Sequence, residues 1–521
     1  MTTPDPARAG TRQWLALVVL TLAVVLLAVD GTVLSLAVPA LTAALRPTAT
    51  QLLWIGDVYS FVLAGLLITM GNLADRIGRK RLLLIGAAGF GVASALAAFA
   101  PSAEVLIAAR ALLGLFGATL MPSTLSIIRN MFTDPAQRIR AIAIWSAGAT
   151  AGAAMGPMVG GVLLEHFWWG AVFLINVPVM VVLIGAGVLL LPESRNHRAG
   201  PIDLLSAALS IAAIIPVVYA IKQLVASGPS LFAAVGVLTG VVSGAWFVRR
   251  QRRLLQPLVD VALFRVPAFS GAVLANAIAI FALSGLLFFY SQYLQLVRGF
   301  RPVVAGLAEL PLTLAAIAVV FVIGAIARRL GAGRAIGTGL LVAATGLVLL
   351  AGAEAAPSYV WMALALVPIG LGVGLASALS TDAVVAAVPR ERAGAAASVA
   401  ETAYELGTAL GIALLGSLHT LMYRAHLDVP NDLPASLRDA VTDSLANASR
   451  VLPGTQFADL LTHAQQAFTT AMQLTSLAAA FLVAAAAVLA WRHIPSAGPA
   501  RRPAGTPSPS GEGTQPAATV A

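Results

Sequence analysis

Residues 71–81 read GNLADRIGRKR, and this short charged segment lies between two long apolar runs, 51–70 and 82–100. Its glycines allow a tight backbone turn and a close approach of two helix ends. Asp75 and Arg76 are placed to bridge helix termini at a water interface, and cations in such a turn favour the cytoplasmic side of a membrane. The segment predicts a short inner turn between two membrane helices; an ordinary basic loop is the alternative.

The composition supports an all-α polytopic membrane protein. The chain has 521 residues, of which 59% are hydrophobic and 10% are charged, whereas ordinary soluble domains carry about 25% charged residues. The net charge of +10 does not indicate a nucleic-acid partner, because the cations fall in short loops and not on one basic face. With no cysteine, disulfides, thiol catalysis and Cys-ligated metal sites are excluded.

Runs of about 20 apolar residues predict fourteen membrane spans. The spans are expected near 14–38, 51–70, 82–100, 104–128, 140–163, 170–191, 203–225, 230–248, 268–290, 303–326, 335–353, 358–380, 395–418 and 469–491. No small-residue cleavage site follows the first run, so we interpret it as an uncleaved helix.

The distribution of Arg and Lys predicts the orientation of these spans. If the N-terminus lies inside, 24 cations fall in the inner segments and 6 in the outer loops, while Arg110 and Lys222 lie within spans. Such an excess on one side is expected of cytoplasmic loops. We therefore expect both termini to be cytoplasmic, in a bacterial inner membrane.

An internal repeat predicts two six-helix halves. Residues 324–331, GAIARRLG, repeat the spacing of glycine and charge in 71–78 and also lie between two spans on the inner side. Aligned on these turns, the expected division is an N-terminal segment 1–13, a first bundle 14–191, an inserted helix pair with linker 192–265, a second bundle 266–492 and a cytoplasmic tail. Residues 422–468 are expected to form an outer loop with two short helical pieces, and residues 493–521 a disordered tail.

The fifth span contains a row of small residues, GAAMGPMVGG at 152–161. Gly152, Gly156 and Gly160 recur every four residues, so another helix can pack very closely against that face. Pro157 removes a backbone hydrogen bond and bends the helix, and Gly161 extends the small-residue run. A plain packing seam is the alternative interpretation.

Charged side chains within spans are the main candidates for a functional site. A charge at mid-bilayer costs about 2.5–3.5 kcal/mol and therefore needs a partner or a role. Helical rise places Asp30 roughly 24 Å into the first span, and Asp57, Arg110 and Glu309 about 9 Å from the outer end of theirs. Four buried charges at a similar depth in the outer half of the bundle predict a proton relay or a cation site. A structural Asp–Arg pair is the alternative for Arg110.

The thirteenth span carries two acids one helical turn apart, Glu401 and Glu405, with Tyr404 beside them. Two like charges in a low-dielectric setting cannot both ionise cheaply. A carboxyl that is protonated at one stage and ionised at another can exchange a proton for a cationic ligand. Hydration of Glu401 near the inner end is the alternative for that residue.

These segments resemble the major facilitator superfamily, and its fourteen-helix drug:proton antiporters of the QacA and LfrA type in particular. The 71–81 turn resembles the loop between helices 2 and 3, to which Gly71, Gly78 and Arg79 belong with Asp75 and Arg76. Residues 30–39, DGTVLSLAVP, resemble the first-helix signature, and residues 166–178, HFWWGAVFLINVP, the region after helix 5. The 152–161 string resembles the antiporter motif, and Arg110 the helix 4 arginine.

The resemblance implies a proton-driven exporter of amphiphilic, cationic drugs, acting as a monomer in the lipid bilayer. Asp30, Arg110 and Asp57 are then expected in proton coupling, and Glu309, Glu401, Glu405 and Tyr404 in cation recognition. No enzyme activity, cofactor or metal is expected, and the chain lacks a phosphate-binding loop. The alternatives are a dedicated self-resistance exporter of one antibiotic, a nutrient or siderophore importer, and a membrane receptor or structural protein.

Overall fold

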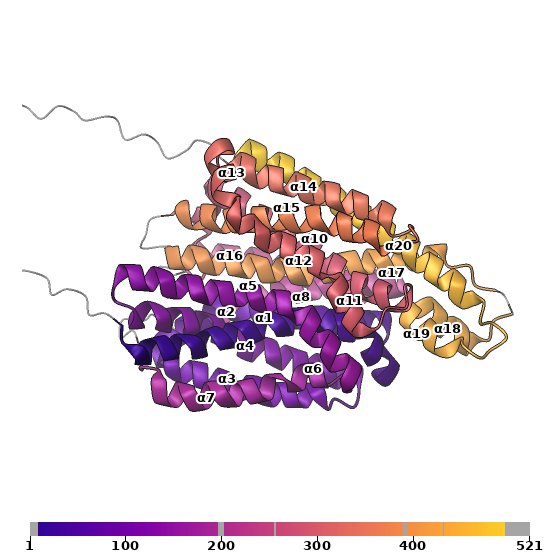
Figure 1. Ribbon diagram of the computed structural model, residues 1–521, viewed down its shortest axis with the longest axis horizontal. Helices are drawn as coiled ribbons and strands as arrows, with labels where there is room; N and C mark the ends of the chain where they lie inside the picture. The colour runs from indigo at the N-terminus through magenta and orange to yellow at the C-terminus, as the bar shows by residue number, and fades with distance from the viewer. Residues whose placement is uncertain (1–8, 196–202, 255–256, 389–392, 431, 495–521) are drawn as a thin grey trace, which may run out of the picture.

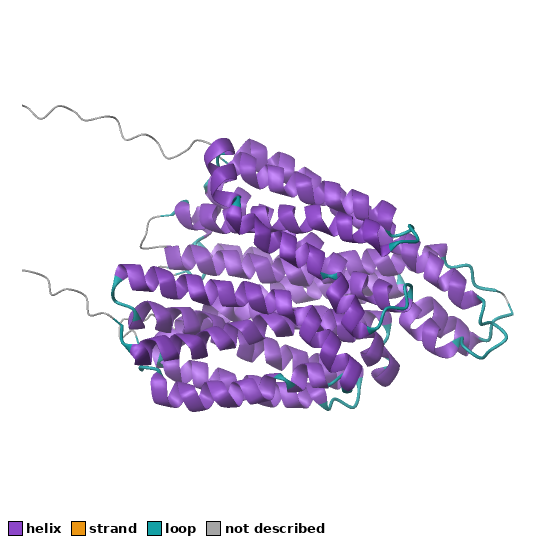
Figure 2. Cartoon of the chain, in the orientation of Figure 1, coloured by secondary structure: helices purple, strands orange, loops and turns teal. Residues whose placement is uncertain are grey.

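A computed structural model describes residues 9–195, 203–254, 257–388, 393–430 and 432–494. The described part contains helices and loops and no strand (Figure 2). Of the expected tail 493–521, residues 495–521 lie outside the described residues, whereas His493 is still helical. The first eight residues of the expected N-terminal segment also lie outside the described residues.

The helices of the first half and of the inserted pair follow in chain order. They are α1 (Thr11–Leu45), α2 (Ala49–Ile77), α3 (Arg79–Ala98), α4 (Ala103–Met131), α5 (Pro135–His166), α6 (Ala171–Leu174), α7 (Asn176–Leu190), α8 (Leu204–Ser227) and α9 (Leu231–Gln251).

The second half opens with a 3-10 turn and contains eleven α-helices and a π-helical turn in its described residues. The elements are η1 (Val261–Arg265), α10 (Pro267–Leu296), α11 (Pro302–Ala308), α12 (Leu310–Ala318), η2 (Val319–Phe321), α13 (Ile323–Leu330), α14 (Ala332–Ala353), α15 (Tyr359–Ala386), α16 (Ala393–Leu410), η4 (Gly411–Leu415), α17 (Gly416–His426), α18 (Ala435–Asp443), α19 (Leu445–Val451) and α20 (Leu460–His493).

Thirteen helices in the described residues are long and apolar enough to cross a membrane, and a fourteenth span is added if one bent pair is counted. This pair is 302–318 with 323–330, bent by 55°. Within it, Pro311 lies in the first turn of α12 and supplies no backbone N–H, so the helix is interrupted at Glu309. The tenth expected span, 303–326, is therefore a broken helix. Each of the other thirteen expected spans contains a helix that is long and apolar enough to cross a membrane, as in a multi-pass membrane protein.

The same helix pairing recurs in the two halves. In the first half α1 packs on α5, α2 on α4, and α3 on both α4 and α7; in the second α10 packs on α16, α12 on α15, and α14 on both α15 and α20. The two sets lie side by side in Figure 1, the first in indigo to magenta and the second in red to yellow. The buried apolar residues of the two bundles form one continuous core.

We call the end of the molecule that carries Thr11 and His493 the terminus end, and the opposite end the loop end. The loop end carries α18 and α19 (Figure 1). The segment expected as a loop at 422–468 is shorter than expected, because α17 continues to His426 and α20 already begins at Leu460. Both extensions are supported by burial, since Tyr423 and Phe468 pack on each other.

The inserted pair α8 and α9 touches both halves. Gly236 and Gly240 of α9 lie directly against the α8 backbone, where an added Cβ would come within 2.7 Å of the Pro216 carbonyl and 2.9 Å of the Ala213 carbonyl. Besides α9, α8 packs on α2 of the first half and on η4 and α17 of the second.

Candidate functional site

The turn between α2 and α3 is held by an ion pair and by the chain after α7. Arg79 lies 2.7 Å from the Asp75 carboxylate, and its backbone N–H donates to the Ser194 carbonyl at 2.9 Å. Gly78 has φ +110°, and a Cβ there would lie 2.7 Å from the Glu193 carboxylate. Arg76 is exposed. The contacts that hold this turn all come from the first half.

The small-residue face of α5 is a close packing seam against two different helices. Gly152, Gly156 and Gly160 lie against α1, next to Val25, Thr32 and Val33. At the loop end the seam crosses to the second half: a Cβ at Gly161 would lie 2.8 Å from the Pro302 carbonyl of α11, and Gly306 of α11 packs on the Pro157 carbonyl. A larger side chain on this face would displace backbone.

Asp30 and Arg110 form a buried pair at the centre of the first half. Their side chains are almost inaccessible, and Arg110 Nη1 lies 3.3 Å from Asp30 Oδ2. Asn176 of α7 donates its amide to the other carboxylate oxygen, Oδ1, at 2.8 Å, and also to Ser94 of α3 at 3.1 Å. Asp30 is thus held by α4 and α7 together.

The Arg110 guanidinium has further partners on α2. Its Nε donates to the Ile55 carbonyl at 3.1 Å and its Nη2 to the Gly56 carbonyl at 3.5 Å, and its Cζ lies 4.7 Å from the centroid of the Tyr59 ring. The guanidinium therefore keeps acceptors even without the Asp30 charge. These carbonyls also bring Arg110 beside the backbone that carries Asp57.

Asp57 pairs with a cation of the inserted helices. Lys222 Nζ of α8 lies 2.6 Å from Asp57 Oδ2 and 3.8 Å from the centroid of the Trp54 ring. Both charged side chains are buried, and Asp57 Oδ1 accepts no hydrogen bond in the described residues.

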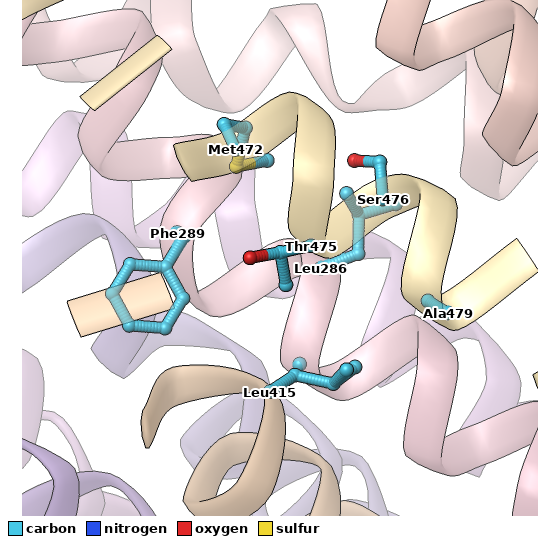
Figure 3. A pocket seen from close by; sticks show the side chains of 8 residues that line it. Leu286, Phe289, Leu415, Met472, Thr475, Ser476 and Ala479 are labelled. Atoms are coloured by element: carbon cyan, nitrogen blue, oxygen red, sulfur yellow. The ribbon is translucent and has the colours of Figure 1, made fainter. Parts of the chain in front are cut away.

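Two acids of the second half, Glu309 and Glu354, lie apart from this network. The Glu309 side chain is 2% exposed, and the described residues give it no hydrogen bond or ion pair. Glu354, just after α14, is also buried; Ser476 of α20 donates to its Oε1 at 3.1 Å, while its Oε2 has no partner in the described part. Ser476 also lines a cavity of about 10 Å³ between α10, η4 and α20, roughly the size of one water molecule (Figure 3).

The two acids of α16 differ in their surroundings. Glu405 is 8% exposed and faces the Ser60 hydroxyl of α2, across the interface between the halves. Glu401 is half-buried, and Tyr404 is 39% exposed. The described structure gives no hydrogen bond or ion pair to the Glu401 side chain, so it does not join the Asp30 network.

Contacts at the loop end join the two halves. Asp443 of α18 accepts from the Ala49 N–H that begins α2 at 3.0 Å, and burial raises the pKa of this carboxyl despite that bond, the Asn447 amide and nearby Arg424. Gln295 of α10 donates to the Leu36 carbonyl of α1 at 3.0 Å. The halves are therefore tied together at the loop end.

Three residues of these networks were not selected from the sequence. Lys222 stands out only as a charge within a span, Asn176 only as part of the 166–178 string, and Glu354 lies just outside an expected span. A rule that every intramembrane charge needs a partner would have selected Lys222 but not its partner.

The chain matches known transporters over nearly its whole length. The model of the Major Facilitator Superfamily matches residues 20–412. The multidrug efflux pump LfrA of Mycolicibacterium smegmatis is 48% identical, with 94% of this chain and 97% of that protein covered. The methyl viologen resistance protein SmvA of Salmonella typhimurium is 38% identical, with 88% and 93% covered.

Solved structures agree on the fold. A bacterial homologue of the human lysosomal transporter Spinster, in an inward-facing and unoccupied conformation, superimposes with a TM-score of 0.65 at 18% identity, covering 93% of this chain and 98% of that one. At this identity the match shows the fold alone. Fold, family model and relatives agree that the chain belongs to the major facilitator superfamily of membrane transporters, and it is not an enzyme.

Proposed function

We propose that this protein exports amphiphilic, cationic drugs across a bacterial inner membrane in exchange for protons, as a monomer with both termini cytoplasmic. The observation that carries the proposal is the buried Asp30 carboxylate, which is held by Arg110 and Asn176 and has no access to the surface. Relatives named as efflux and resistance proteins support drug export, and the excess of cations in the expected inner loops supports the orientation.

The geometry supports a proton cycle at Asp30. When the carboxyl takes up a proton it loses its attraction for Arg110, and the guanidinium retains the Ile55 and Gly56 carbonyls. The Asn176 Oδ1 accepts no hydrogen bond in the described residues. Rotation of this amide presents an acceptor to the protonated carboxyl, so either charge state of Asp30 can be satisfied.

Proton binding can then change how the halves pack. The charged pair draws α1 and α4 together, and Arg110 extends that contact to α2. Losing the charge on one partner weakens the link between these helices, and rocking of one bundle against the other would open the loop end. The α5 seam must slide or part where it contacts α11, because α11 belongs to the other bundle.

For the proposed cation recognition, Glu405 is the best-placed acid of the second half. It lies on α16 and faces α2, so it belongs to the interface between the bundles where alternating access places a substrate. Asp57, Glu309, Glu401 and Tyr404 remain candidates for coupling or recognition. No cofactor is needed, since the proton gradient supplies the energy.

A dedicated exporter of one antibiotic is the second candidate. The tetracenomycin C resistance and export protein of Streptomyces glaucescens is 34% identical over 94% of this chain. LfrA, which is named a multidrug efflux pump, is more similar at 48% identity, so we favour broad export.

Dye accumulation in cells tests both candidates. Cells that lack their own drug pumps would express this protein or carry an empty vector, and would be loaded with several structurally unrelated cationic dyes. We expect lower accumulation of most dyes, and loss of the difference when a protonophore collapses the gradient. Export of one compound alone would indicate the dedicated exporter, and unchanged accumulation of every dye would overturn cation export.

A further inference from the structure

The Lys222 ammonium lies between a carboxylate and an aromatic ring, two groups that bind cations. It contacts the Asp57 carboxylate at 2.6 Å and faces the Trp54 ring at 3.8 Å. Phe61, seven residues beyond Trp54 on α2, lies with its ring centroid 6.5 Å from that of Trp54. A carboxylate beside aromatic faces is the arrangement that binds ammonium and other organic cations.

The inserted helices do not need this ion pair in order to dock. The α8–α9 contact is closed by Gly236 and Gly240, and Arg250 joins α9 to Asp203 before α8 at 3.0 Å. The α8 face toward the bundle is apolar: Val218 packs with Phe61 of α2 and with Ala409 and Ala413. Burying an ion pair costs desolvation on both sides, and an apolar pair of the same volume often packs as stably.

Asp57 and Trp54 could also make contacts that Lys222 does not use. Asp57 Oδ1 has no hydrogen-bond partner in the described residues, although the side chain is fully buried. Trp54 keeps part of its surface accessible. A ligand cation that reached this ring would make the same two contacts as Lys222, and the two positive charges cannot occupy the site together.

We propose that Trp54 and Asp57 form a subsite for the positive charge of an organic cation, and that Lys222 is a tethered cation that fills this subsite until the ligand displaces it. The inference rests on the proposed function and adds a role for the inserted helices. Because α8 touches α2, η4 and α17, displacement of Lys222 loosens a link between α8 and the first half exactly when the ligand is bound.

The tether lowers the apparent affinity of the subsite, since a ligand binds only to the fraction of molecules in which Lys222 has left. Removing the Lys222 charge should therefore tighten binding of a monovalent cation. Ethidium binding to the purified full-length protein in lipid nanodiscs measures this directly, by the change in ethidium fluorescence. We expect Lys222→Met to bind ethidium about tenfold more tightly than the natural protein.

Two further variants separate charge from packing. Lys222→Gln keeps a hydrogen-bond donor for Asp57 without the charge, and it should also bind ethidium more tightly; it replaces the Met variant if that variant fails to fold. Lys222→Arg keeps the charge and should bind as the natural protein does. Asp57→Asn in the Lys222→Met background should remove the gain, because the carboxylate that holds the ligand charge is gone.

The outcomes distinguish this inference from the proposed function. If the natural protein neither binds ethidium nor lowers its accumulation in cells, the proposed export of cations fails. If the natural protein binds and exports ethidium while neutral residues at 222 leave its affinity unchanged or weaker, the tethered-cation inference is overturned and Lys222–Asp57 is a structural pair.

Discussion

Asp30 is the residue on which the proposed exchange depends, and its surroundings explain why an acid rather than an amide stands there. Arg110 and Asn176 both donate to the carboxylate, so the ionised form is satisfied without water. An asparagine in its place would keep the shape but could neither take up nor release a proton.

We therefore expect Asp30→Asn to reduce export of every substrate to the level of cells without the protein. Asp459→Asn is the matched control, because Asp459 is exposed at the start of α20 and its side chain caps no N–H group. Efflux of a monovalent dye at equal expression measures the effect. Accumulation of dye against its gradient by Asp30→Asn cells would contradict the proton role.

Glu405 should instead discriminate ligands by charge. The attraction between a carboxylate and a ligand doubles when the ligand charge doubles, so Glu405→Gln should weaken divalent cations more than monovalent ones. Efflux of a monovalent dye and of a divalent biguanide can be compared in the same cells, with Glu401→Gln as the comparison from the same helix. Equal losses for both ligands would argue against a direct contact with the ligand charge.

For single residues, the sequence predicted that charges lie deep in the spans but not which charged side chains contact each other. Asp30 and Arg110 were both selected, and the structure pairs them. The Asp57 partner was not predictable, because Lys222 belongs to the inserted pair, which has no counterpart in the internal repeat. Helical rise gives depth along one helix, whereas the neighbour depends on where α8 docks.

Among the elements, α5 has a closely packed face that accepts only small side chains. Gly156 lies against α1, where an added Cβ would clash with the Thr32 hydroxyl and come within 3.3 Å of the Val29 carbonyl. A side chain as large as leucine would therefore push α1 and α5 apart. Small residues in such seams let membrane helices approach closely.

Gly156→Leu should therefore abolish transport by forcing α1 and α5 apart. Gly185→Leu is the matched control, since Gly185 lies in helix α7 and an added Cβ would meet nothing within 4 Å. Both variants should be measured for dye efflux and for the amount of protein in the membrane. Normal efflux by Gly156→Leu would mean that the seam tolerates separation and plays no part in the cycle.

The turn between α2 and α3 should affect the conformational change of transport more than the stability of the folded protein. The Asp75–Arg79 pair is partly exposed, so its loss costs at most about 1 kcal/mol. We expect Asp75→Ala to stay in the membrane while its efflux falls several-fold, because the turn then no longer stabilises one conformation.

Asn72→Ala is the control for the turn, since Asn72 is exposed in the same segment. Efflux rates and membrane levels of the two variants would be compared with those of the natural protein. Full drug resistance in an Asp75→Ala strain would count against the role of the turn.

The spans were predictable from the sequence because a run of about 20 apolar residues forms a helix that just crosses the hydrocarbon core of a membrane. Their ends were less so: α1 runs from Thr11 to Leu45, beyond the expected 14–38, because helices continue past the apolar core. Pro311 in the sequence could have indicated the break at Glu309, whereas the 55° bend lies around η2, where no proline stands.

The whole molecule presents one arrangement of an alternating-access cycle. At the loop end the halves are tied together where α18 meets α2, α10 meets α1 and α11 meets α5. Nearer the middle of the helices, α16 packs on α2. In the proposed cycle, the loop-end contacts must break before a ligand can leave at the loop end, and the Asp30 network changes its charge in the same step.

The most direct test of proton-for-drug exchange is transport by the purified protein in liposomes that contain no other transporter. A pH jump creates a proton gradient, and uptake of ethidium is followed together with the pH inside. We predict that the natural protein moves ethidium against its gradient while protons move the opposite way, and that Asp30→Asn moves neither. Ethidium transport that is unaffected by the gradient, or that persists in Asp30→Asn, would contradict it.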